Sequence, residues 1–454
     1  MAVMPSPFLV PAVIEALRRS PQYGAITHIV PMEAETACAI RVRSLSSGGF
    51  ILTGDSDALL YDIGACGGVV FFRTVYQPLG DHAHLPNQLD CVKFYPQDIT
   101  THLGVPLSRL AYELSHKKYN RLGEAVRACS GPTLDPDLYS RFLDEHLGMN
   151  LPSHAAEYAA YVASQLQFMD PRLAEIYLQF LEAQPTKPHE ATQSTLAGPL
   201  VFLPPLIDCP TWRSLWSMSI SIRQLAYTLI SQTVASDVAV VWEHVRVQSL
   251  EARGKPINIL AADAAEAMVH RLLSDFKGIS TALGVDSDEL WFIIALYSEL
   301  YECRPSSILN LGLGRLNGLN LLELDNPYST YVRYMNTLTH SVLYSLRFLA
   351  QALKIQPRHT TKEHSPSYYA LQRFLNRLPL LDQYPTMEQT AKVLRGISLS
   401  RICSISELSS HMDLDFMAAS PQSRVEPLPR HNVGQDALPR VTYVNPFDIL
   451  RLES

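Results

Sequence analysis

The sequence lacks the marks of membrane, secreted and zinc-binding proteins. It has no run of about 18 apolar residues, so no transmembrane helix is predicted. The first 20 residues are interrupted by proline and weakly charged, unlike a secretory signal. The seven cysteines are scattered, with no CxxC pair and no histidine partner at zinc spacing, which favours isolated thiols in a reducing compartment. We expect an intracellular protein, nuclear or cytoplasmic, with no membrane partner.

A basic surplus is also missing. The net charge is -7 and the sequence pI is about 6.1, whereas proteins that bind duplex DNA usually carry a positive field that neutralises phosphates. Nucleic acid would therefore have to be bound by local patches. The best small patch combines Lys117, Lys118 and Arg121 with Arg41 and Arg43. A solvated helix face is the alternative interpretation of these residues.

Motifs of nucleotide-binding and serine-hydrolase sites are absent. Gly312, Gly314 and Gly318 lie close together, but they lack the G-x-G-x-x-G spacing and follow no clear strand. No G-x-S-x-G elbow occurs. We interpret the three glycines as loop residues.

The start of the chain has the pattern of a small α/β unit. Apolar runs at 26–30, 50–53 and 68–72 predict strands, and the first two flank a helical pattern from 33 to 45. Strand, helix and strand in this order predict a parallel pair joined by a right-handed crossover. Residues 7–20 predict a helix that feeds the first strand.

Beyond about residue 98 the strand signals fade and helical periodicity dominates. A helix is predicted over 171–183, with Asp170-Pro171 as its start signal. We expect five segments: an α/β fragment at 1–130, a helical extension at 131–185, a Pro-rich linker at 186–210, a helical domain at 211–411 and a mostly disordered tail at 412–454. The tail contains a short apolar island, NPFDILRL at 445–452, which can dock back onto the protein.

Four carboxylates follow the predicted strands. Glu33 and Glu35 open the helix after Pro31, and Asp55 and Asp57 come just past the second strand. Sites in parallel sheets form beyond the carboxyl ends of strands, so these side chains are expected to meet there. Like charges that close need a cation, and Mg²⁺ or Mn²⁺ prefers carboxylate oxygens. Such sites hydrolyse phosphodiesters.

A structural interpretation of the same residues exists. A lone DxD is usually a turn or a helix cap, and ExE at a helix start complements the helix dipole. Two acidic pairs at matched strand ends are more specific than either motif alone. Asp62 is expected to be a turn residue.

The stretch ITHIVPMEAETACAIRVRSLSSGGFILTGDSDALLYDIG, at 26–64, has a P-x-E-A-E helix start and an x-D-x-D strand end. It resembles the internal region of the XPG/flap-endonuclease (PIN-like) superfamily, and is most similar to the Asteroid-domain branch in its fungal members. SIRQLAYTLI, preceded by Trp212 and Trp216, supports this likeness. The motif-bearing resemblance covers about residues 5–130.

The resemblance implies that Glu33, Glu35, Asp55 and Asp57 are the metal ligands and catalytic residues of a nuclease-like hydrolase site that binds Mg²⁺ or Mn²⁺. The family normally has a preceding region with the first strand and further acidic ligands, and this chain begins too late to contain it. A later family ligand also has no clear counterpart. Glu113 is the nearest carboxylate, and we expect it on a helix surface.

The expected fold is therefore an α/β PIN-like fragment with a parallel sheet, followed by a mainly α-helical domain. Two functions remain open. One is a metal-dependent nuclease acting on structured DNA or RNA. The other is a non-catalytic scaffold that binds nucleic acid or protein on the same fold. Aromatic-rich helices at 291–301 and 327–346 are interpreted as core, with a protein-binding groove as the alternative.

Overall fold

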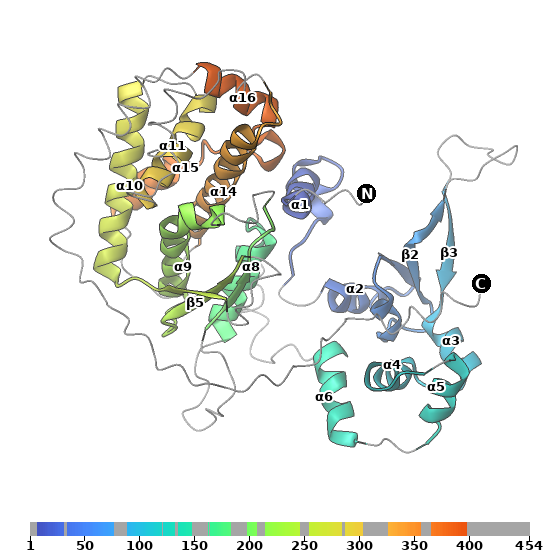
Figure 1. The fold of residues 1–454 in the computed structure, drawn as a ribbon. Helices are drawn as coiled ribbons and strands as arrows, with labels where there is room; N and C mark the ends of the chain where they lie inside the picture. Colours follow the sequence, from blue (N-terminus) through green and yellow to red (C-terminus); the bar gives the residue numbers. More distant parts are fainter. Residues whose placement is uncertain are drawn as a thin grey trace, which may run out of the picture. The chain divides into compact units, whose positions relative to one another are not determined.

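The computed structural model describes most of the chain up to residue 396. The described residues are 7–30, 34–76, 89–119, 121–131, 135–147, 162, 164–182, 198–206, 214–245, 254–283, 287–302, 326–355 and 365–396. The chain divides into two compact units (Figure 1). The helical unit comprises Met1–Pro31 and Tyr161–Val425, and the α/β unit comprises Met32–Ala160 and Glu426–Ser454. None of the helices described is long and apolar enough to cross a bilayer.

The α/β unit is built around one three-stranded sheet. Its elements are α2 (Ala34–Arg43), β1 (Gly49–Thr53), the 3-10 helix η2 (Ser56–Leu60), β2 (Gly67–Tyr76), β3 (Asp90–Phe94), α3 (Pro96–Leu103), α4 (Leu107–His116), α5 (Leu122–Cys129) and α6 (Pro136–Leu147). β1 pairs with β2 in parallel and β2 with β3 antiparallel. The strands predicted at 50–53 and 68–72 are confirmed, and the α/β fold with parallel strands is confirmed by the β1–β2 pair of this mixed sheet. The parallel pair predicted between 26–30 and 50–53 does not form. β3 was not predicted.

The strand predicted at 26–30 is wrong. Gly24–Ile26 forms a 3-10 helix, η1, and residues 27–30 have no regular structure. The hydroxyl of Thr27 donates to the Tyr23 carbonyl at 2.8 Å, and the Gln167 amide donates to the Ile29 carbonyl at 3.0 Å. An apolar run becomes a strand only where a neighbouring strand forms hydrogen bonds with its backbone. Here backbone carbonyls of the run and of the turn before it accept hydrogen bonds from side chains instead.

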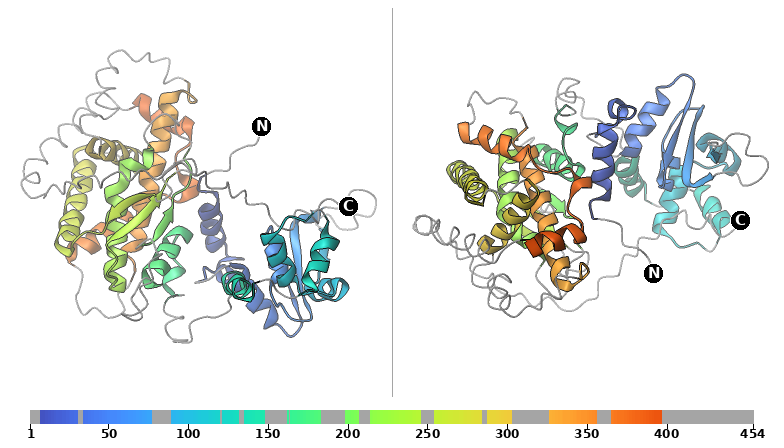
Figure 2. Two further views of the ribbon diagram at one scale, coloured as in Figure 1. Left: turned by 60° about the horizontal axis from the view of Figure 1, so that its bottom comes forward. Right: turned by 90° about the horizontal axis from the view of Figure 1, so that it is seen from above.

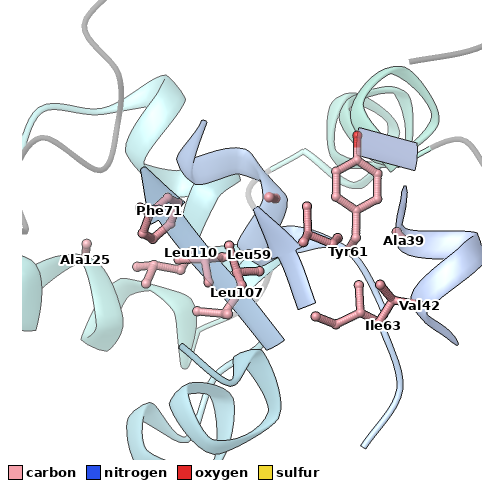
Figure 3. Packing of buried hydrophobic residues seen from close by; sticks show 12 residues of the cluster. Ala39, Val42, Leu59, Tyr61, Ile63, Phe71, Leu107, Leu110 and Ala125 are labelled. Carbon is pink, nitrogen blue, oxygen red and sulfur yellow. The ribbon is translucent and has the colours of Figure 1, made fainter. Parts of the chain in front are cut away.

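The core of the α/β unit lies on one face of its sheet. Ile51 from β1 and Val69 and Phe71 from β2 pack against side chains from α2, α4 and α5 (Figure 3). The residues of this cluster that Figure 3 labels are Ala39, Val42, Leu59, Tyr61, Ile63, Phe71, Leu107, Leu110 and Ala125. Successive strand residues point to opposite faces, so this core is fed by every second residue of the strands.

The helical unit confirms the mainly α-helical prediction for the later part of the chain. Its elements are α1 (Leu9–Arg19), η1, α8 (Pro171–Glu182), β4 (Leu200–Phe202), η3 (Leu215–Ser219), α9 (Ile220–Val234), β5 (Val240–His244), β6 (Lys255–Asn258), α10 (Ala262–Leu283), α11 (Ser287–Glu302), α14 (Thr330–Ala352), α15 (Pro366–Leu375), η4 (Leu381–Gln383) and α16 (Met387–Gly396). The largely buried α14 packs against α9, α11 and α16 (Figure 2). A small sheet in the order β4-β5-β6 was not predicted, and β4 comes from the stretch expected to be a linker.

The first helix is part of the helical unit. The Glu15 carboxylate of α1 binds the Arg347 guanidinium at 2.6 Å and accepts the Leu381 backbone N–H at 2.8 Å. The ring of Phe8, just before α1, packs against Tyr344 with centroids 4.7 Å apart. The helix predicted at 7–20 therefore forms, and it is fixed by residues more than 300 positions away.

Candidate metal and nucleic-acid site

The first predicted acidic pair opens α2. Glu35 lies in the first turn of the helix and is half-buried, a position in which its charge complements the helix N-terminus. Burial, and then the nearby Glu35 charge, raises the pKa of the Cys38 thiol one turn further on. Glu33 and Pro31 lie outside the described residues.

The second acidic pair follows β1. Asp55 is the N-cap of η2, and its Oδ1 accepts the Asp57 backbone N–H at 3.0 Å. The Asp55 N–H in turn donates to Thr53 Oγ1 at 3.0 Å. Asp55 is exposed and Asp57 is half-buried. The DxD therefore acts as a local cap, as the structural interpretation of this motif expects, and its carboxylates also lie at the carboxyl end of a parallel strand.

A buried hydrogen bond joins the segments that carry the two pairs. The hydroxyl of Thr36, the residue after Glu35, donates to the Tyr61 hydroxyl at 3.3 Å. Tyr61 directly follows η2, the helix that Asp55 caps. α2 also packs along β1. These contacts link the first turn of α2 to the end of η2, and the convergence of the four carboxylates stays a prediction.

Carboxylates have the right chemistry for a hard divalent ion. In the described part of the chain, however, no three His, Cys, Asp or Glu side chains form a group that could hold a metal. Glu35, Asp55 and Asp57 by themselves are therefore not such a group. Glu33, the fourth predicted ligand, lies outside the described residues, so the set of four stays a prediction.

Asp62 has the turn role predicted for it. Its Oδ1 accepts the Gly64 N–H at 3.1 Å, and its other oxygen pairs with the Arg43 guanidinium at 3.1 Å. Both side chains of this ion pair are more than half exposed, and such surface pairs stabilise proteins little. Arg43 can therefore exchange this partner for another anion at small cost.

The residues predicted to bind nucleic acid are all exposed: Arg41, Arg43, Lys117, Lys118 and Arg121. Two of them lie in the last turn of α2, and the other three lie between α4 and α5. Arg41 is six residues beyond Glu35, about 9 Å along the helix axis. Their role in nucleic-acid binding stays a prediction.

The expected surface position of Glu113 is wrong. Only 3% of this residue is exposed, and its carboxylate binds the Arg109 guanidinium at 2.7 Å and accepts the Tyr119 hydroxyl at 2.9 Å. Burial, followed by this hydrogen bond, raises the pKa of Tyr119 to about 12. The i,i+4 spacing of Arg109 and Glu113 is the sequence pattern that could have indicated this ion pair. Glu113 is thus a buried structural residue, and both of its carboxylate oxygens accept hydrogen bonds from neighbouring side chains.

The helical unit contains a buried ionic cluster that sequence reasoning missed. The Arg223 guanidinium binds both Glu243 oxygens, at 2.6 and 2.8 Å, and also donates to the Ser219 and Ser345 hydroxyls. Tyr227 donates to the same carboxylate at 2.8 Å. Arg223 and Tyr227 are wholly buried and Glu243 is 1% exposed, so the cluster joins α9, β5 and α14 rather than meeting a ligand.

Comparison with known proteins gives one match. A family model described as "XPG domain containing" matches residues 5–259, more than half of the 454 residues. No curated protein and no solved structure matches the chain. The match extends past the 5–130 region that carries the recognisable motifs, through the end of β6 in the helical unit. The chain therefore belongs to the XPG-domain-containing family, whose members include nucleases.

Proposed function

We propose that this XPG-family protein is of the Asteroid type, most like the fungal members, and acts on nucleic acid. Its site consists of Glu33, Glu35, Asp55 and Asp57, which together bind Mg²⁺ or Mn²⁺ for phosphodiester hydrolysis. The hydrogen bond between Thr36 and Tyr61 supports the proposal, because it links the helix that carries Glu35 to the end of the 3-10 helix that Asp55 caps. Family membership supports the nuclease chemistry.

The choice of test variant follows from the capping role of Asp55. Asp55→Ala would remove the acceptor for the Asp57 N–H and disturb η2 together with any metal site. Asp55→Asn keeps an oxygen at the capping position and removes the charge. Asp62→Asn is the matched control, because it removes an exposed turn carboxylate of the same unit from outside the cluster.

The full chain, Asp55→Asn, Glu35→Gln and Asp62→Asn are titrated with Mn²⁺ and Mg²⁺ in a calorimeter, then incubated with flap, bubble and single-stranded substrates. We expect metal binding and cleavage by the parent and by Asp62→Asn. In Asp55→Asn and Glu35→Gln we expect the metal affinity and the cleavage rate to fall at least tenfold, because the loss of even a residue that supports a metal ligand typically lowers both by about 10–100-fold. Equal metal affinity in all four proteins would refute the site.

A non-catalytic binding module is the second candidate. Two observations favour it: the described carboxylates do not form a group of three that could hold a metal, and one of the aspartates is already used as a cap. On this reading, labelled single-stranded and branched nucleic acids bind equally in Mg²⁺ and in EDTA. Lys117→Glu with Lys118→Glu weakens that binding, and no cleavage accompanies it. Metal-dependent cleavage would exclude this candidate.

A further inference from the structure

The sheet of the α/β unit has a second face, opposite its core, that is apolar and open. The strand register places Leu52, Val70 and Lys93 side by side on this face. Phe50 lies one pleat away from Leu52 and so shares the face. Phe50 is 44% exposed, Leu52 54% and Leu89 66%. We call this surface the open face.

The open face is shaped into a shallow groove. The Phe50 ring lies across Gly68, where an added Cβ would come within 2.5 Å of it. The Lys93 ammonium sits 4.9 Å from the centre of that ring, and Tyr95 meets its edge with centroids 5.9 Å apart. This groove has a volume of about 280 Å³ and is built on exposed residues of the sheet. Val75 and Cys91 also line it.

An open apolar face is unusual for parallel strands. Parallel sheets are normally covered on both faces, because their strands are apolar on both. Here the helices cover one face, and the described residues leave Phe50, Leu52 and Leu89 on the other in contact with solvent. Patches of this kind mark docking sites for a further segment.

We propose that residues 443–450 of this chain, YVNPFDIL, occupy the groove on the open face. This segment lies outside the described residues, within the stretch that follows α16. Phe447 and Ile449 are two residues apart, so in an extended chain they point to one side, as Phe50 and Leu52 do. The proposal is independent of the function proposed for the acidic cluster.

The segment belongs to the same chain as the groove, and residues 397–442 separate its start from the end of α16. For a random-coil chain of 46 residues the average span is roughly 35–40 Å. Tethering of this kind gives an effective concentration of about 1 mM. A contact with a dissociation constant of only about 100 µM would then keep about nine-tenths of the molecules docked.

Cys91 is a built-in reporter of this docking. It lines the groove and is exposed, whereas the exposed thiols of Cys38, on α2, and Cys66, before β2, lie away from it. The full chain is compared with a Phe447→Asp, Ile449→Asp variant by timed alkylation and peptide mass spectrometry. Cys129, half-buried beside the core, shows whether the α/β unit stays folded in both.

We expect Cys91 to react about tenfold more slowly in the parent than in the variant, in line with nine-tenths occupancy. Cys38 and Cys66 are expected to react at equal rates in both proteins. A synthetic peptide of residues 441–452 should restore protection of Cys91 in the variant. Equal Cys91 rates in the two proteins would overturn the proposal. So would protection in the parent that disappears on dilution, because a second copy would then be the occupant.

Discussion

Removing one partner of the buried Arg223–Glu243 pair is expected to destabilise the helical unit severely. Arg223→Met leaves the Glu243 carboxylate buried with only the Tyr227 hydroxyl as a polar partner among the bonds described here. Breaking a buried ion pair on one side costs about 3–5 kcal/mol, a large part of the roughly 5–15 kcal/mol that stabilises a typical domain. Glu243→Gln strands the guanidinium instead and should cost a similar amount.

The double variant Arg223→Met, Glu243→Gln separates charge from packing. Its glutamine oxygen still accepts the Tyr227 hydroxyl. The Trp216 carbonyl, now 3.0 Å from the guanidinium, loses that donor, as do the Ser219 and Ser345 hydroxyls, which keep hydrogen bonds to each other. One unsatisfied buried group costs about 1–3 kcal/mol. The double variant is therefore expected to be more stable than either single variant.

Urea unfolding followed by tryptophan fluorescence measures these values for one unit alone. All four tryptophans lie in the Tyr161–Val425 part of the helical unit. Arg19→Met is the matched control, because its 3.5 Å pair with Asp382 is half exposed, and it should cost less than about 1 kcal/mol. Additive costs of the two single changes in the double variant would show that the buried pair is not coupled, and the reasoning would be refuted.

Two further predictions concern carboxylates near the start of the chain. Glu35→Gln should lower the pKa of the Cys38 thiol, although burial still keeps it above its ordinary value. Alkylation of Cys38 should therefore speed up at a lower pH in the variant than in the parent. An unchanged pH profile would show that the Glu35 charge does not raise this pKa. Glu15→Gln should lower the stability of the helical unit by about 2 kcal/mol, because it removes a charge-assisted hydrogen bond to the part-buried Arg347. An unchanged midpoint of urea unfolding, followed by tryptophan fluorescence, would count against the anchoring of α1.

Local patterns predicted the elements that local chemistry determines. The helical pattern at 33–45 and the apolar run at 50–53 correspond to α2 and β1, and Gly48 lies between these two elements with a φ of 73°. A Cβ added there would come within 2.4 Å of the Cys66 carbonyl oxygen. The start of α8 was likewise visible in Asp170, whose Oδ1 accepts the Arg172 N–H at 3.1 Å. Both features depend on residues within a few positions or on a backbone conformation that favours glycine.

Long-range partners were not predictable from the same patterns. Asp170 also accepts the Tyr344 hydroxyl at 2.9 Å, across 174 positions, and nothing in a helix-start signal indicates that contact. Arg223 is a charged residue in the otherwise mostly apolar α9, but its partner Glu243 lies on a strand that was not predicted. The strand expected at 26–30 failed for the same reason, because its pairing depended on neighbours that periodicity does not encode.

The family match does not coincide with a unit that could fold by itself. It ends at residue 259, yet α14 begins at Thr330 and supplies partners to side chains inside the match. Arg347 binds Glu15, and Ser345 accepts from Arg223 at 3.0 Å. A chain cut at residue 259 would leave buried charges without these partners, at a cost of several kcal/mol for each. The residues beyond the match therefore complete the core on which the matched part of the helical unit rests.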